Sequence, residues 1–139
     1  MIRLLAVLLV LTLSGACAHT KKTADTESLR PTVESFHQRV RWKDYRMAAR
    51  YIVPERRQEF EKAVREHEDE RDLDITDYEI EGVELADEGQ RAIVTSTFRW
   101  TRLPSLSVQK ATVTSEFVYR DGTWLMERQE GGPFDGALP

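Results

Sequence analysis

The period of the hydrophobic residues changes halfway along this 139-residue chain, and this change limits the possible folds more than any other feature. From Leu29 to about residue 67 the apolar side chains recur every three or four positions, as on one face of a helix. From Tyr78 onward they alternate with polar ones, as in a strand with one buried face. Helices followed by strands predict an α+β domain, with the helices on one face of an antiparallel sheet.

Three helices are predicted in the first half. The first has an apolar stripe at steps of four, three and four residues, made of Leu29, Val33, Phe36 and Val40. Asp44 is expected to cap a second helix that runs from Tyr45 to Ile52. Pro54 ends this helix and suits the first turn of a third, which carries Phe60, Ala63, Val64 and His67 on one face.

Four strands are predicted in the second half. The alternation of residues 78–81 resumes in the opposite phase after Gly82, which is typical of a β-bulge in a curved sheet. Asp121-Gly122 is a two-residue hairpin turn. The turn predicts four cross-strand pairs: Tyr119 with Trp124, Phe117 with Met126, Ser115 with Arg128, and Glu116 with Glu127. Two opposed carboxylates are stable only in water, so we expect that face of the hairpin to be solvated.

The N-terminus has the pattern of an export signal. Arg3 precedes an apolar run from Leu4 to Leu13, which is too short to cross about 30 Å of hydrocarbon. Leu13-Ser14-Gly15-Ala16-Cys17 then resembles the lipobox of bacterial lipoproteins, although Ser14 stands where that family usually has Leu. The resemblance implies cleavage before Cys17 and acyl chains, such as palmitate, on that residue. The alternative is an ordinary signal peptide cut after Ala18, which would remove Cys17.

This resemblance also implies a place and an organisation for the chain. Ala18 rather than Asp follows the cysteine, so we expect the outer membrane of a bacterial cell envelope rather than the inner one, with the domain facing the periplasm. The expected segments are a signal peptide at 1–16, the lipidated Cys17 and a flexible tether at 17–27, the domain at 28–130, and a C-terminal tail at 131–139.

The segment FHQRVRWKDYRMAARYIVPERRQEF, residues 36–60, resembles the opening of small lipoproteins of the nuclear-transport-factor-2-like group in the cystatin-like superfamily. Over residues 28–130 the resemblance implies N-terminal helices packed on a curved four-stranded antiparallel sheet that forms a cone. The superfamily includes ketosteroid isomerases and polyketide cyclases, which use a carboxylate base inside the cone.

Few residues here suit such chemistry. Asp77 is expected on the polar face of its strand and Asp44 is explained as a cap, so no catalytic residue is assigned. His37 and His67 lie beside apolar residues, but neither has a second His or Cys at ligand spacing, so no metal or cofactor is predicted. Six residues either line the mouth of a ligand pocket or fill the core: Trp42, Tyr45, Tyr51, Phe98, Trp100 and His37.

Charge is spread unevenly along the chain. The net charge of −4 gives no reason to expect nucleic-acid binding. Residues 39–57 hold seven basic and two acidic residues, whereas residues 59–88 hold 14 acidic and three basic ones. The basic segment either meets anionic lipid headgroups or an acidic partner, or pairs with the neighbouring acids.

Together these features predict a lipid-anchored, non-catalytic binding or accessory module of the cell envelope. Its expected partners are the membrane, through Cys17, and an envelope protein or a small apolar ligand. One alternative is an isomerase- or cyclase-like enzyme that uses the cone, and another is a structural subunit of an envelope complex.

Overall fold

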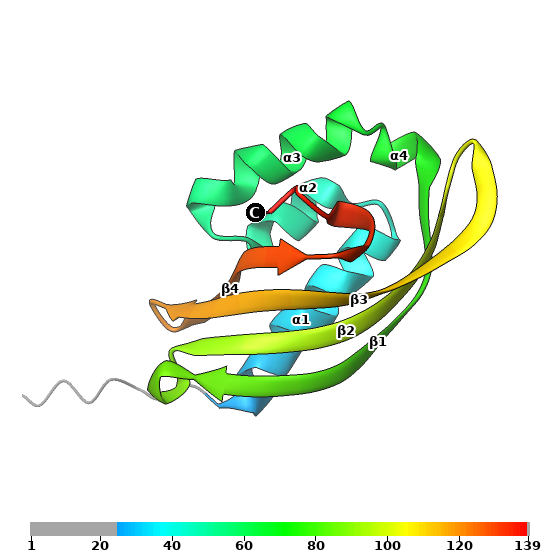
Figure 1. Cartoon of the computed structure of the whole chain (residues 1–139). Helices are drawn as coiled ribbons and strands as arrows, with labels where there is room; N and C mark the ends of the chain where they lie inside the picture. Colours follow the sequence, from blue (N-terminus) through cyan, green and yellow to red (C-terminus); the bar gives the residue numbers. More distant parts are fainter. Residues whose placement is uncertain (1–24, 139) are drawn as a thin grey trace, which may run out of the picture.

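A computed structural model describes residues 25–138 as helices packed on one face of a curved sheet (Figure 1). The helices are α1 (Thr26–Arg41), α2 (Tyr45–Ala48), α3 (Arg57–Glu66) and α4 (Asp69–Asp72). The strands β1 (Leu73–Ala86), β2 (Arg91–Arg102), β3 (Ser105–Arg120) and β4 (Thr123–Glu130) form one antiparallel sheet in that order. The predicted α+β class is confirmed. Within residues 25–138 no helix is long and apolar enough to span a membrane.

Helix α1 forms because its apolar stripe is buried against the sheet. Leu29, Val33, Phe36 and Val40 are all buried, as their spacing predicts. Asp25 caps the helix, since its carboxylate accepts a hydrogen bond of 2.8 Å from the Ser28 amide. Helix α1 therefore begins before residue 28, the expected start of the domain.

Asp44 occupies the predicted N-cap position of α2, but its side chain makes no capping hydrogen bond. Its carboxylate accepts a hydrogen bond of 2.8 Å from Arg39 Nη1, and only its backbone carbonyl accepts from the amides of Met47 and Ala48. Helix α2 is one turn long and continues as a 3₁₀ turn at Ala49–Tyr51. A second 3₁₀ turn at Pro54–Arg56 leads into α3, as the proline predicts. His67 is exposed at the end of α3 instead of lying on its buried face.

The sheet bends where the sequence predicts. The pairing of β1 with β2 shifts by one residue between Ile80 and Gly82, which confirms the bulge. A second shift, between Ile75 and Asp77, was not predicted. On the inner face of β2 the side chains of Ala92, Val94, Ser96 and Phe98 are buried, as the alternation indicates.

The β3–β4 hairpin confirms the predicted turn but not the register beyond it. Tyr119 pairs with Trp124 and Phe117 with Met126. The register then shifts, so that Glu116 lies opposite Arg128 and Ser115 opposite Gln129. Glu127 becomes the extra residue of a bulge. The predicted pairing of Glu116 with Glu127 is therefore wrong, because the bulge separates the two acids and gives each an arginine.

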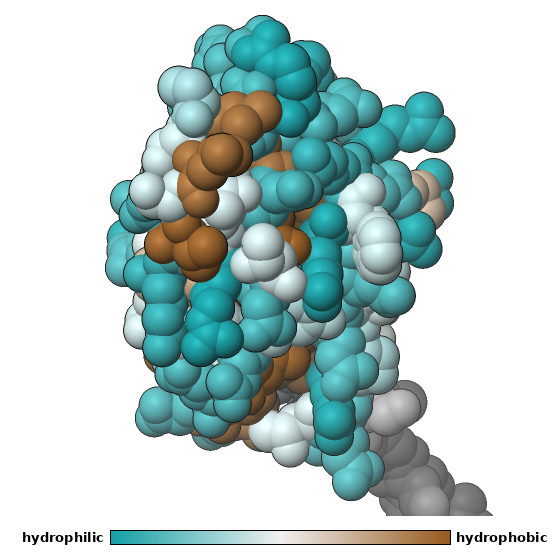
Figure 2. All heavy atoms as spheres, turned by 90° about the vertical axis from the view of Figure 1, so that its right-hand side faces the viewer, coloured by the Kyte–Doolittle hydropathy of each residue, from teal (hydrophilic) through white to brown (hydrophobic). Residues whose placement is uncertain are grey.

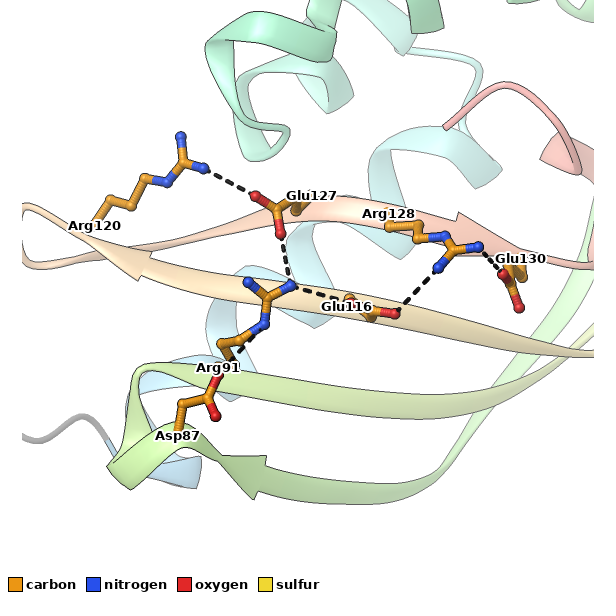
Figure 3. A network of polar contacts seen from close by, with 7 residues as sticks. All are labelled: Asp87, Arg91, Glu116, Arg120, Glu127, Arg128 and Glu130. Carbon is orange, nitrogen blue, oxygen red and sulfur yellow. Dashed lines mark hydrogen bonds and ion pairs between the residues drawn. The ribbon is translucent and has the colours of Figure 1, made fainter. Parts of the chain in front are cut away.

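These arginines form the network drawn in Figure 3. Arg91 Nη2 lies 3.2 Å from Glu116 Oε2 and 2.7 Å from Glu127 Oε2, and Arg120 Nη2 lies 2.9 Å from Glu127 Oε1. Arg128 is 3.8 Å from Glu116 and also contacts Glu130. Val118 lies on the same face of β3 and is buried, so this face is not simply solvated as expected.

The C-terminal residues belong to the domain and are not a tail. Phe134, Ala137 and Leu138 are buried, and the Gln129 amide donates a hydrogen bond of 2.9 Å to the Leu138 carbonyl. The segment after β4 turns back because Gly131 adopts a φ of 80°, which suits glycine. The expected boundary at residue 130 is wrong because these apolar side chains complete the core under α3.

Candidate functional site

His37 lies fully buried inside the cone, between α1 and the sheet. Its ring centroid is 4.9 Å from that of Tyr78 on β1 and 5.0 Å from that of Phe98 on β2. Nδ1 lies 2.6 Å from the Val33 carbonyl oxygen, and because a carbonyl only accepts, Nδ1 carries the proton. Burial lowers the pKa of His37 to about 4, so the ring is neutral near pH 7.

Two polar atoms in this interior have no partner among residues 25–138. They are His37 Nε2 and the hydroxyl oxygen of Ser96, and both are buried. A buried polar group without a hydrogen bond costs about 1–3 kcal/mol. Two of them in one small core indicate a place where a hydrogen-bonding molecule would be stabilised.

A groove of about 410 Å³ lies between the first half of α1 and the middle of β1. Val33 and Ile80 are among its lining residues. The Val33 carbonyl holds His37, and Ile80 lies directly opposite Ser96 in the sheet register. Neither His37 nor Ser96 lines the groove itself, but each is bonded to or paired with a residue that does. Its lining is Thr26, Glu27, Arg30, Val33, Glu34, Ile80, Glu81, Gly82 and Val83.

The charged residues of the groove lie at its rim. Arg30 is exposed and forms an ion pair of 2.7 Å with Glu34 on the next turn of α1. Glu81 accepts a hydrogen bond from the Thr97 hydroxyl. Val83, also exposed, points to the same side of the sheet as the buried Val94 opposite it. The groove thus combines an apolar floor with a polar rim, which is the usual composition of a small-molecule site.

The six residues predicted as a pocket do not share one cavity. His37 and Phe98 stack in the core, and Trp100 is half-buried. Trp42 is 73% exposed at the end of α1 and lines a surface groove beside the start of β1. Tyr45 is buried and its hydroxyl donates to the Asp69 carbonyl oxygen at 3.4 Å, while Tyr51 is half-buried against the core.

The other candidates lie outside the cone. Asp77 Oδ2 accepts from Arg99 Nη1 at 3.1 Å on the outer side of the sheet, and Asp44 is bound by Arg39. No group of three or more metal-ligating side chains occurs in residues 25–138. Cys17 lies outside the described residues.

Among residues 25–138 one carboxylate is buried, that of Asp69, and it serves the fold. It forms an ion pair with Arg102, which also donates to the Pro133 carbonyl at 3.0 Å. Burial is the main cause that raises the pKa of Asp69, and the Arg102 hydrogen bond opposes it. Burial also raises the pKa of the Tyr45 hydroxyl, and the charge of Asp69 acts in the same direction. These contacts join α4 to the end of β2 and to the C-terminal segment.

The uneven charge is partly neutralised by contacts between neighbours. Lys43 lies 3.3 Å from Asp74, and Arg56 lies 3.1 Å from Glu59, so both pair with the acidic segment. Arg57 instead donates to the carbonyls of Ile52 and Arg50. Ion pairs with neighbouring acids therefore neutralise part of the positive charge of residues 39–57.

The sequence prediction missed Ser96 and the groove. A signal for Ser96 was present, since it is the one polar residue on the inner face of an otherwise apolar strand segment. The groove had no such signal, because it is bounded by one half of α1 and by a strand that lies about fifty residues further on.

The comparisons with known proteins identify the fold. No family model and no curated protein matches the chain. A SEC-C motif containing protein from Rhodopseudomonas palustris has a similar structure, with a TM-score of 0.61 and 23% identity, covering 76% of this chain and 79% of that one. A protein named as a SnoaL-like polyketide cyclase from Mesorhizobium loti has a TM-score of 0.50 and 10% identity, covering 74% and 98%. One named as a polyketide cyclase from Xanthomonas campestris has a TM-score of 0.51 and 13% identity, covering 70% and 85%.

At these identities the likeness concerns the fold alone. The helices, the curved four-stranded sheet and these neighbours agree with the predicted architecture. The described domain therefore has the nuclear-transport-factor-2-like cone fold that SnoaL-like polyketide cyclases share.

Proposed function

We propose that this chain is a lipid-anchored protein of the bacterial cell envelope whose cone domain binds a small apolar ligand and does not catalyse a reaction. The observation that carries the binding role is the groove beside the two buried, unpartnered atoms, His37 Nε2 and Ser96 Oγ. The anchor and the outer-membrane location are supported by the lipobox-like segment that ends at Cys17 and by Ala18 after it.

The chemistry of the interior favours binding over catalysis. A general base works best when its pKa is near the working pH, whereas that of His37 is about 4. No carboxylate orients its ring, because Nδ1 is held by the Val33 carbonyl. The carboxylates weighed as bases, Asp44 and Asp77, are bound by arginines outside the cone.

The likeness to polyketide cyclases supports the alternative of a cyclase- or isomerase-like enzyme only through the shared fold. Such an enzyme would need His37 to act as its base without a carboxylate hydrogen-bonded to its ring. Turnover lost in a His37→Leu variant would establish this alternative.

The interior also defines the ligand class. Nε2 of His37 can only accept a hydrogen bond, so the ligand must carry a donor such as a hydroxyl. The groove floor at Val33 and Ile80 requires an apolar body. An aliphatic alcohol meets both requirements, since its chain lies along the floor and its hydroxyl reaches past Val33 and Ile80 to the unpartnered atoms.

Ligand binding is tested with 1-dodecanol and its methyl ether, which differ by the one donor. We expect the alcohol to bind, and His37→Leu to weaken it about tenfold, the usual effect of one lost hydrogen bond, while the ether is unaffected. Val83→Trp should block both molecules at the groove, and His67→Leu on the exposed end of α3 should change neither. Equal affinity of the alcohol for the unsubstituted protein and the His37→Leu variant would contradict the proposed site.

The anchor is tested separately with the Cys17→Ser variant in the host cell. We expect labelled palmitate to appear on the unsubstituted protein and not on the variant, and membrane fractionation to place only the unsubstituted protein with the outer membrane. A variant that still labels with palmitate would refute the anchor.

A further inference from the structure

The tip of the β2–β3 hairpin carries three of the seven exposed large apolar residues of the described chain. Every residue from Leu103 to Lys110 is exposed, and within this stretch Leu106 is 80% and Val108 63% exposed. Figure 2 shows apolar side chains gathered over this hairpin. Trp42 joins them at the same end of the molecule, since it lines a groove with Asp74 and Ile75 at the start of β1. We call Trp42, Leu103, Leu106 and Val108 the distal apolar surface.

This surface lies far from the N-terminal end of the domain. β1 begins opposite Arg102, at the base of the hairpin, and its second half lies beside the start of α1 (Figure 1). With 14 residues at about 3.3 Å each, β1 runs for about 45 Å along its curve between the two ends. β4 ends opposite Thr114, so the first half of β3 has no strand on its other side and the hairpin projects freely.

The charges around the distal apolar surface are basic. Residues 102–112 and 39–43 contain no acid, and they include Arg41 and Lys43 on either side of Trp42, and Lys110 two residues after Val108. Arg41 and Lys110 form no ion pair with the part of the chain that the structure describes. Their positive charge is therefore available to a binding partner.

The acids that border this surface are largely neutralised. Asp69 pairs with Arg102, Asp72 with Arg71, Asp74 with Lys43 and Asp77 with Arg99. Glu70 is the acid of residues 69–77 for which the described chain offers no ion pair.

From these observations we infer that the distal apolar surface inserts into the headgroup region of an anionic lipid bilayer. A tryptophan at the end of α1, three aliphatic side chains on the hairpin tip and free cations beside both, all at one end of the molecule, match the apolar and charged layers of a membrane interface. The apolar side chains enter the boundary of the acyl chains while Arg41 and Lys110 meet the lipid phosphates. The inference stands on these exposed side chains and does not need a lipid on Cys17.

The test uses the protein as its host cell processes it, incorporated into or mixed with vesicles of phosphatidylcholine and phosphatidylglycerol with brominated acyl chains. Bromine quenches a tryptophan only at close range. The emission of Trp42 is obtained by subtracting the spectrum of a Trp42→Phe variant, and its quenching reports whether Trp42 lies near the acyl chains. We expect this emission to shift to shorter wavelength and to be quenched. Phosphatidylcholine alone should give a weaker effect, because the cations then lose their partners.

A Leu106→Ser, Val108→Ser double variant should lower the vesicle-induced quenching or partitioning by at least about tenfold, since two buried aliphatic side chains are lost. The matched control is Leu85→Ser with Ile93→Ser, which removes two exposed apolar residues at the other end, outside the groove, and should leave the quenching unchanged. All four positions are exposed, and equal thermal unfolding would verify the fold.

An unshifted, unquenched Trp42 on vesicles that hold the protein would overturn the inference and leave the surface to a protein partner. This outcome is independent of palmitate labelling at Cys17 and of dodecanol binding at His37. Failure of the proposed function is thus distinguishable from failure of this inference.

Discussion

The two sides of the concave face of the sheet are closed in different ways. On the β4 side, the rings of Phe60, Tyr45 and Phe134 pack against one another with centroids 5.7–6.5 Å apart, and the C-terminal segment fills the space under α3. On the β1 side, α1 leaves a groove at Val83, and His37 lies behind it with an unpartnered nitrogen.

The difference teaches where this fold can hold a ligand. The interior of the β4 side is filled by packed aromatic rings, and its buried carboxylate is paired, as Asp69 with Arg102. The side next to the bulge of β1 has both a cavity and a hydrogen-bonding requirement. Stability and binding are therefore assigned to opposite sides of one sheet, and four predictions test this division.

The largest effect is expected on the closed side, from Phe60→Ala. Phe60 is fully buried and touches the rings of Phe36, Tyr45 and Phe134, so its removal should lower the free energy of unfolding by about 3–5 kcal/mol. Val83→Ala on the open side should change it by no more than about 0.5 kcal/mol. Urea unfolding of both variants measures the contrast, and similar losses would show that the two sides are packed alike.

The next effect concerns acid on the open side. The folded protein keeps His37 neutral down to its pKa of about 4, whereas the unfolded chain takes up this proton near pH 6.5. The contribution of His37 is therefore full above pH 6.5 and is lost as the pH falls toward 4, by about 3 kcal/mol.

The difference in unfolding free energy between the unsubstituted protein and His37→Leu, followed from pH 7 to 4, measures this loss. We expect the variant to be the less sensitive of the two to acid. His67→Leu is the control and should keep the sensitivity. A His37→Leu variant with an unchanged acid slope would place the titrating group elsewhere.

A smaller effect is expected at the turn that leads the C-terminal segment into the closed side. A Cβ on Gly131 would lie 2.6 Å from the Thr112 carbonyl oxygen, and the φ there is 80°. Gly131→Ala should therefore cost about 1–3 kcal/mol in a thermal or urea unfolding experiment. Gly136→Ala has a similar φ but meets nothing within 4 Å, so it should cost less. A larger loss of stability in Gly136→Ala than in Gly131→Ala would mean that the backbone at Thr112 moves away from the added Cβ at little cost.

The smallest effect is expected from Asp25→Ala at the start of α1, beside the groove. Loss of this cap should cost about 1 kcal/mol and raise the hydrogen-exchange rate of the Ser28 amide, which donates to Asp25 at 2.8 Å. Asp44→Ala is the matched control, because Asp44 makes a surface ion pair and no side-chain cap. Equal losses in the two variants would remove the distinction between them.

Local chemistry made much of the fold predictable. The stripe from Leu29 to Val40 gave α1, Gly82 gave the bulge of β1, and Asp121-Gly122 gave the hairpin with its first pairs. These features depend on spacing within one element or on the conformation of one turn, and both are present in the chain itself.

Some local predictions failed because a distant or competing partner was stronger. The Asp44 carboxylate binds the Arg39 side chain instead of accepting a capping hydrogen bond from an amide of α2. The register beyond Phe117 changes because the bulge at Glu127 lets Arg91 and Arg120 meet the two acids, and Arg91 comes from another strand. His37 was among the predicted site residues, but its unpartnered nitrogen exists only because Phe98 and Tyr78 exclude water around it.

The sequence by itself determined the order of helices and strands, the curvature of β1 and the segment that ends at Cys17. Only the tertiary structure decided which side of the cone is filled and which is open. The reason is physical: residues 131–138 are buried or exposed according to whether α3 covers them, and the groove is the space between α1 and β1, which no single segment contains.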